Sequence, residues 1–219
     1  MPDLMNRRDF STALLVSGTA ASFLVAGAAR AQGPEPLEGR DFTKLDPPQP
    51  TAAKGKVEVL EFFSYACPHC NAFEPTLAAW VRTLPPDVVF RRVPVPFLYN
   101  AENFERTYYA LETIGAVDAM QSKIFSAVHV DKQRLDKVED IAAVVAKNGG
   151  DAAKFTAAFK SFSVATAVSR AKKMVADYKV DSVPTLIIQG RFSTSPAQAG
   201  GSPQALAVTD ALIQRARKG

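Results

Sequence analysis

The sequence predicts an α/β fold in which a strand–helix–strand unit, a long helical insert and a strand–strand–helix unit follow one another. Three observations lead to this prediction. The run Val57–Phe63 has five apolar residues in seven, as expected of a strand covered on both faces. Between Asn103 and Tyr178, apolar residues recur at helical spacing instead. Strand character then returns at Val183–Ile188, so we expect helices to be inserted between two parts of one sheet.

Residues 1–31 are expected to form an export signal. A pair of arginines, Arg7-Arg8, precedes the apolar stretch Ala13–Ala29, and Ala29-Arg30-Ala31 has the small-x-small pattern of a cleavage site. The paired arginines leave both the twin-arginine route and the general export route open. A membrane anchor is the alternative, but serine, threonine and glycine dilute the stretch, and a spanning helix needs about 20 mostly apolar residues.

Residues 32–55 are proline-rich and are expected to form an extended tail with a short edge strand near Phe42. Residues 56–98 are expected to form one β-α-β unit with a parallel, right-handed crossover to the strand Val88–Val93. Pro68 suits the first turn of its helix, where a missing N–H is no loss, and Pro75 should kink that helix. Its buried stripe is Phe73, Leu77, Trp80 and Leu84.

Residues 99–179 are expected to form an inserted helical domain. Asp136 followed by Glu139 is typical of a helix start, and Asn148-Gly149-Gly150 of a break. We interpret its apolar stripes as core and not as a cofactor-binding surface. The stripes are Phe104/Tyr108/Leu111, Val138/Ile141/Val145, Phe155/Phe159/Phe162 and Val164/Val168/Ala171/Val175.

Residues 180–219 are expected to complete the fold as a β-β-α unit. Gln189–Phe192 has the pattern of a hairpin turn after the strand Val183–Ile188. Ser202-Pro203 is expected to cap the final helix. That helix would place Ala205, Val208 and Leu212 on one face.

Composition and cysteine usage narrow the possible functions. The net charge of +4 is mild and no basic cluster is interleaved with aromatic residues, so we expect no nucleic-acid partner. Cys67 and Cys70 are the only cysteines of the chain. An exported protein would ordinarily use spare cysteines as structural disulfides, and this chain has none to spare. A Cys-x-x-Cys between a strand and a helix therefore indicates thiol–disulfide redox chemistry.

Three features of the chain indicate a known family. They are the lead-in Leu60-Glu61-Phe62-Phe63-Ser64, the motif Cys67-Pro68-His69-Cys70 and, after the insert, an x-Pro that opens a strand. In these features the chain resembles the DsbA family of periplasmic disulfide oxidants. The resemblance runs from Val57 to the C-terminus and implies a thioredoxin fold with an inserted helical domain. It implies a periplasmic enzyme that donates the Cys67–Cys70 disulfide to newly exported or unfolded proteins through a mixed disulfide on Cys67. It also implies reoxidation by a quinone-linked membrane partner of the DsbB type. We expect a monomer with no cofactor beyond this disulfide.

The position of the two thiols suggests how the pair would work. Cys67 falls at a helix start, where unpaired N–H groups and the helix dipole favour an anion, and His69 can also stabilise its thiolate. Both effects lower the pKa of Cys67, which stabilises the reduced form and makes the disulfide more oxidising. Cys70, one turn into the helix, is expected to be buried with a higher pKa.

Two further positions are candidates for the site. Glu61 could pass protons to or from Cys70 with a pKa raised by desolvation, or it could be a structural partner of Arg92; the sequence leaves both interpretations open. The peptide bond before Pro184 would be trans by default. The resemblance implies a cis bond that faces the cysteines and leaves the Val183 backbone free to pair with an extended substrate.

Rival functions are a reductase or isomerase on the same fold, or a Cu(I)-binding thiol carrier. Pro-His between the cysteines favours the oxidant, residues 32–55 are too short for the dimerisation domain usual in isomerases, and no methionine cluster supports copper binding. His129 is expected at a surface or helix end, in another domain from His69. A zinc site needs four ligands, and these two histidines and two cysteines are badly distributed for one.

Overall fold

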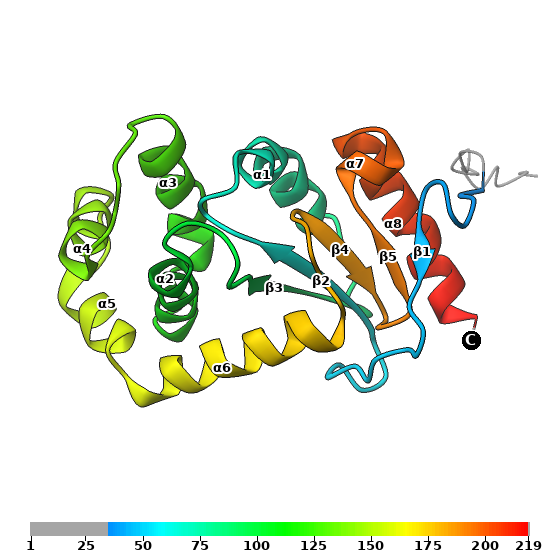
Figure 1. Ribbon diagram of the computed structural model, residues 1–219, viewed down its shortest axis with the longest axis horizontal. Helices are drawn as coiled ribbons and strands as arrows, with labels where there is room; N and C mark the ends of the chain where they lie inside the picture. The colour runs from blue at the N-terminus through cyan, green and yellow to red at the C-terminus, as the bar shows by residue number, and fades with distance from the viewer. Residues whose placement is uncertain (1–34, 219) are drawn as a thin grey trace, which may run out of the picture. The chain divides into compact units, whose positions relative to one another are not determined.

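The computed structural model describes residues 35–218, and five strands in this range form one mixed sheet (Figure 1). The order is β1-β5-β4-β2-β3, so β2, which leads to the cysteine pair, lies inside the sheet. The expected export signal, residues 1–31, lies outside the described residues. The strands are β1 (Thr43–Lys44), β2 (Val57–Phe63), β3 (Val88–Pro94), β4 (Thr185–Ile188) and β5 (Phe192–Thr194).

The strand pairings confirm the predicted connections. β2 and β3 are parallel, β4 is antiparallel to β2 and to β5, and the edge strand expected near Phe42 is β1, paired with β5. The β4–β5 turn contains Gly190 with a φ of 62°. A Cβ there would lie 2.1 Å from the carbonyl oxygen of Gln49, so the turn requires glycine for its backbone conformation and for this close approach.

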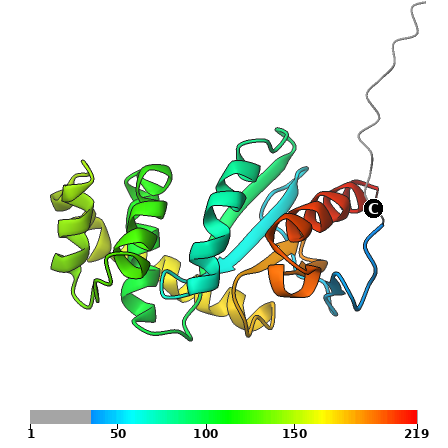
Figure 2. The same cartoon turned by 90° about the horizontal axis from the view of Figure 1, so that it is seen from above.

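Helices cover both faces of the sheet (Figures 1 and 2). Val59 of β2 packs with Leu77 in the layer formed by α1 and α8, whereas Phe62 packs with Val175 of α6 on the opposite face. Successive strand side chains point to opposite faces, which is why β2 is buried at all seven positions. No helix within residues 35–218 combines the length and apolar character needed to cross a membrane. The sheet-covering helices are α1 (Pro68–Val81), α6 (Phe162–Asp177) and α8 (Ser202–Arg217).

The helical spacing predicted between Asn103 and Tyr178 is confirmed. The chain forms α2 (Ala101–Thr113), α3 (Val117–His129), α4 (Val138–Lys147) and α5 (Ala152–Phe159) before α6 returns to the sheet. Their apolar faces form one buried cluster that also contains Tyr65, Cys67 and Cys70. The cysteine pair therefore packs directly against the inserted helices.

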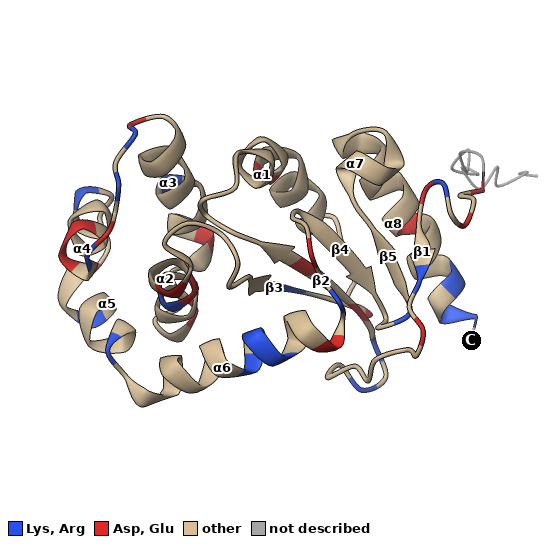
Figure 3. Ribbon diagram, viewed as in Figure 1, with Lys and Arg blue, Asp and Glu red and all other residues tan. Residues whose placement is uncertain are grey.

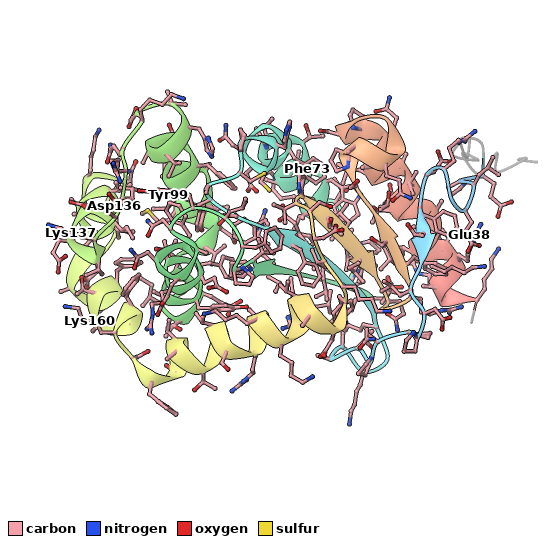
Figure 4. The ribbon with its side chains drawn as sticks, viewed as in Figure 1. Glu38, Phe73, Tyr99, Asp136, Lys137 and Lys160 are labelled. Atoms are coloured by element: carbon pink, nitrogen blue, oxygen red, sulfur yellow. The ribbon has the colours of Figure 1, made fainter. Side chains whose placement is uncertain are left out.

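The predicted start of α4 is wrong by one residue. Lys137 is the N-cap, and its N–H donates to the carboxylate of Asp140 at 3.3 Å. Asp136 instead bonds to the hydroxyl of Tyr99 and pairs with Arg134; Figure 4 shows Tyr99 and Asp136 close together at this position. Asp136, which the local pattern favoured as the cap, is thus engaged in a tertiary contact with the loop before α2 instead.

Two other local predictions are also corrected. Phe162 does not continue the stripe of α5 but begins α6 after the Ser161 cap, and it is 87% exposed. Ser202 is the first residue of α8, whose N-cap is Gly201. A short helix, α7 (Pro196–Ala199), which the sequence did not predict, precedes it. Helix α1 runs through Pro75 to Val81 and ends before Leu84; the kink expected at Pro75 stays a prediction.

Candidate functional site

A tight turn between β2 and α1 presents the cysteine pair. The Cys67 N–H donates to the Ser64 carbonyl oxygen at 3.0 Å, and the Ala66 N–H donates to Ser64 Oγ at 3.1 Å. Cys67 is therefore the N-cap of α1, and Pro68 occupies the first helical turn, where a missing N–H costs no hydrogen bond. The predicted helix start is confirmed.

Hydrogen-bond donors converge on the sulfur of Cys67, a residue that is only 4% exposed. The Cys70 N–H donates to Sγ at 3.3 Å. Hydrogen bonds from the Cys70 thiol and from the backbone of Cys70 and His69, together with the charge of His69, outweigh burial and lower the pKa of Cys67 from 9.0 to about 6. At pH 7 the thiolate then outnumbers the thiol about tenfold.

Cys70 has the opposite character. It is fully buried on α1, and burial, the hydrogen bond to Cys67 and the charge of Glu61 raise the pKa of Cys70 far above its ordinary value. Both thiols are free in this structure. The pair thus consists of one sulfur that ionises readily and one that holds its proton, and a low-pKa thiol is the better leaving group in disulfide exchange.

A buried ionic group lies beneath the pair, formed by β2, β3 and α1. Arg92 Nε donates to Glu61 at 2.8 Å, and Arg92 Nη2 donates to both carboxylate oxygens of Glu74 at 3.0 Å. All three side chains are less than a tenth exposed. In Figure 3, acidic residues are coloured on β2 and α1 and basic residues on β3. The predicted partner of Glu61 is thus confirmed.

Glu74 was missed by the sequence reasoning, although a signal for it exists. It shares the buried face of α1 with Cys70, Phe73 and Leu77, at the i, i+3, i+4, i+7 spacing of a core stripe. Phe73 lies on this helix above the sheet (Figure 4). A glutamate within such a stripe must find a buried cation, because an unpaired buried charge is costly, and Arg92 supplies it.

One cation between two buried carboxylates leaves the group short of positive charge. Burial raises the pKa of Glu61 to about 7, despite the opposing effect of Arg92, and burial also raises the pKa of Glu74. Glu61 consequently has both properties that the sequence analysis treated as alternatives: it is paired with Arg92, and its proton affinity is raised. Its part in proton transfer to Cys70 stays a prediction.

Replacing Glu61 by glutamine is expected to flatten the dependence of unfolding free energy on pH. The folded-state pKa of Glu61, about 7, lies above the ordinary 4.5. The carboxyl's contribution to the unfolding free energy is therefore full below pH 4.5 and is lost as the pH rises through 7. That loss amounts to about 3 kcal/mol at most, and the variant should not show it. Urea unfolding of both proteins at pH 4.5 and pH 8 measures the difference. Equal losses in both proteins would contradict the assignment.

The segment before β4 faces Cys67 from the other side. The Val183–Pro184 peptide bond is cis, as the resemblance implied. Cys67 Sγ lies 3.4 Å from the Val183 carbonyl oxygen, and Thr185 Oγ1 donates to the Ser182 carbonyl at 2.8 Å. The structure therefore brings Val183 to the cysteine pair; that this backbone binds substrate stays a prediction.

The two histidines differ in their exposure and in their contacts, which the sequence did not indicate. His69 is exposed between the cysteines. His129 is the last residue of α3, so the helix-end prediction is confirmed, but it is half-buried and its Nε2 lies 2.8 Å from the Tyr65 carbonyl oxygen. Within residues 35–218, no three histidine, cysteine or acidic side chains are grouped so that they could hold a metal ion.

Comparisons with known proteins agree with this geometry. A family model described as thioredoxin matches residues 52–206. The thiol:disulfide interchange protein DsbA of Bordetella parapertussis is 38% identical over 215 residues, which cover 98% of this chain and 100% of the relative. DsbA of Burkholderia cepacia is 39% identical over 206 residues, which cover 94% and 95%.

Solved structures give the same result. The crystal structure of Pseudomonas aeruginosa DsbA matches with a TM-score of 0.79 and 34% identity over 84% of this chain and 95% of that one. The oxidoreductase DsbA from Xylella fastidiosa matches with a TM-score of 0.77 and 27% identity, over 84% and 99%. The thioredoxin fold with inserted helices, expected from the resemblance, is thereby confirmed.

Proposed function

The chain belongs to the DsbA family of thiol:disulfide interchange proteins and is an oxidoreductase, and on this basis we propose that Cys67 and Cys70 donate their disulfide to cysteines of newly exported, unfolded proteins. The observation that carries the proposal is the opposite character of the two thiols. A thiolate favoured at Cys67 stabilises the reduced pair, and a stabilised reduced form makes the disulfide a stronger oxidant.

The proposed cycle begins when a substrate thiolate attacks Sγ of Cys67 in the Cys67–Cys70 disulfide. The bond between the two enzyme sulfurs breaks, and its electron pair goes to Cys70, which takes up a proton because its pKa is high. A second substrate thiolate then attacks the substrate sulfur of the mixed disulfide. The substrate disulfide forms and Cys67 leaves as a thiolate. Two electrons pass to the enzyme; one substrate proton ends on Cys70 and the other enters solvent.

Neighbouring residues have supporting roles in this proposal. His69 and the amide groups at the start of α1 stabilise the Cys67 thiolate, and Pro68 begins the helix without an unpaired N–H. Glu61, whose negative charge raises the pKa of Cys70, receives or supplies the proton of that thiol. The backbone of Val183 beside Pro184 pairs with an extended substrate, a mode of binding that tolerates many sequences.

Family membership also supports the following expectations. We expect residues 1–31 to direct export and residues 32–55 to form the tail of a periplasmic protein. Residues 56–98 and 180–219 would form the two halves of the thioredoxin fold around the inserted domain of residues 99–179. A quinone-linked membrane partner of the DsbB type would reoxidise the pair, and the chain would work as a monomer without metal or other cofactor.

Equilibration with glutathione buffers tests the proposed oxidant. Because the Cys67 thiolate is stabilised, we expect the midpoint of reduction, where half of the pair is reduced, in buffers far more oxidising than those that half reduce an unperturbed dithiol. Alkylation of free thiols and mass measurement report the reduced fraction. This readout is preferable to fluorescence, since Trp80 lies ten residues beyond Cys70 on α1, about 15 Å along the helix axis. A potential at or below that of glutathione would identify a reductant instead.

A further inference from the structure

We propose that His129 is a positioning residue for Cys67, acting through the Tyr65–Ala66 peptide of the turn that presents the thiol. The inference rests on the proposed function, in which Cys67 is the sulfur that substrates attack. His129 lies in α3, 64 residues from Tyr65, so this contact connects the inserted helices directly to the redox site.

Both polar atoms of the Tyr65–Ala66 peptide group are held by side chains. The Ala66 N–H donates to Ser64 Oγ at 3.1 Å, and His129 Nε2 lies 2.8 Å from the Tyr65 carbonyl oxygen. A carbonyl oxygen only accepts, so Nε2 carries the hydrogen of this bond. The peptide lies at the centre of the turn closed by the Cys67 N–H and the Ser64 carbonyl. Rotation of a central peptide converts one turn type into another, and here it would break both side-chain bonds.

Helix α3 holds Tyr65 at a second point. The Tyr65 hydroxyl donates to Gln121 Oε1 at 2.5 Å, and its ring packs edge-on against Phe125, 5.1 Å between centroids. Tyr65 and Gln121 are both buried. Gln121, Phe125 and His129 recur every four residues, so they share one face of α3. One face of one helix therefore binds the hydroxyl, the ring and the carbonyl of the same residue.

Cys67 follows Tyr65 by two residues, so a small displacement of the Tyr65–Ala66 peptide would change the environment of Cys67 Sγ. Its thiolate depends on the donors at the start of α1, including the Cys70 N–H at 3.3 Å. A turn free to rotate would hold the sulfur less closely over those donors, and the thiolate would lose part of its stabilisation. Losing one hydrogen bond changes an equilibrium by about threefold to tenfold, which sets the expected size of the effect.

The test compares His129→Phe with His129→Gln. Phenylalanine keeps a flat ring of similar size but cannot donate to the Tyr65 carbonyl, whereas the glutamine amide can donate without carrying a charge. The pH dependence of iodoacetamide alkylation gives the Cys67 pKa, and glutathione buffers give the oxidising equilibrium constant. We expect His129→Phe to raise the Cys67 pKa and to lower the equilibrium constant about threefold to tenfold. His129→Gln should restore most of both values.

Tyr65→Phe and Tyr108→Phe form a matched pair that keeps the inference testable if His129→Phe fails to fold. Each loses one hydroxyl from the same aromatic cluster around Phe63, but the Tyr108 hydroxyl donates to Glu112 of its own helix and not to α3 within the described residues. Only Tyr65→Phe should raise the Cys67 pKa. Variants that lose stability while the Cys67 pKa and the glutathione equilibrium stay unchanged would overturn the inference. A wild-type pair that is not oxidising would instead overturn the proposed function.

Discussion

Replacing Cys67 by serine is expected to reduce disulfide donation to the uncatalysed rate, whereas replacing Cys70 by serine is expected to trap mixed disulfides. Cys67 is the sulfur at the helix start, with its pKa lowered to about 6, so it alone is suited to exchange with substrate. Cys70 is fully buried and holds its proton. Without Cys70, a disulfide between Cys67 and a substrate cannot be resolved from within the enzyme.

Oxidation of a reduced peptide with two cysteines measures the loss of donation. Mixed disulfides are formed separately, from the disulfide-linked dimer of a peptide with one cysteine: the Cys67 thiolate attacks the peptide disulfide and one peptide thiolate leaves. Non-reducing electrophoresis detects the species that Cys70 would otherwise resolve. Each single variant is the control for the other, because both remove one sulfur from the same turn of helix. Stable mixed disulfides formed by the Cys67→Ser protein would reverse the assignment of the two sulfurs. Full activity in either variant would remove the pair from the mechanism.

Replacing Arg92 by methionine is expected to cost about 3–5 kcal/mol of unfolding free energy near neutral pH. Arg92 is the single cation between Glu61 and Glu74, and its side chain is only 9% exposed. Methionine fills part of the volume but leaves two carboxylates buried without a cation. Since only protonation could then neutralise those carboxylates, the loss of unfolding free energy should be larger at pH 8 than at pH 5.

Arg217→Met is the matched control for this change. Arg217 makes two hydrogen bonds of 2.8 Å with Asp87 at the surface, and exposed ion pairs contribute at most about 1 kcal/mol. A double variant that adds Glu74→Gln to Arg92→Met should recover part of the lost stability, because one buried charge is removed. Urea unfolding measures all of these variants. A loss no greater than that of Arg217→Met would show that the buried group does not stabilise the fold.

Local sequence determined most of the framework of this protein. The apolar run of β2, the proline that opens α1 and the spacing of the inserted helices each depend on residues close together in the chain. The chemical identity of the site was also local, because Cys67 and Cys70 share one helical turn. At the start of α4, local prediction failed because a distant residue intervened: the Tyr99 hydroxyl donates to Asp136, and α4 begins one residue later than predicted.

Only the tertiary structure decided what surrounds the two sulfurs. Arg92 donates to Glu74, 18 residues away in the sequence, and to Glu61, 31 residues away. Tyr65 is bound by Gln121 and by His129, which are 56 and 64 residues away. The stripe of α1 places Glu74 in the core, but no periodic pattern identifies its partner or the contacts of Tyr65, since each depends on how a strand, the active-site helix and an inserted helix pack together. The sequence by itself determined which chemistry the chain performs; packing brought distant charges and hydrogen bonds to the two thiols, and these determine how differently Cys67 and Cys70 hold their protons.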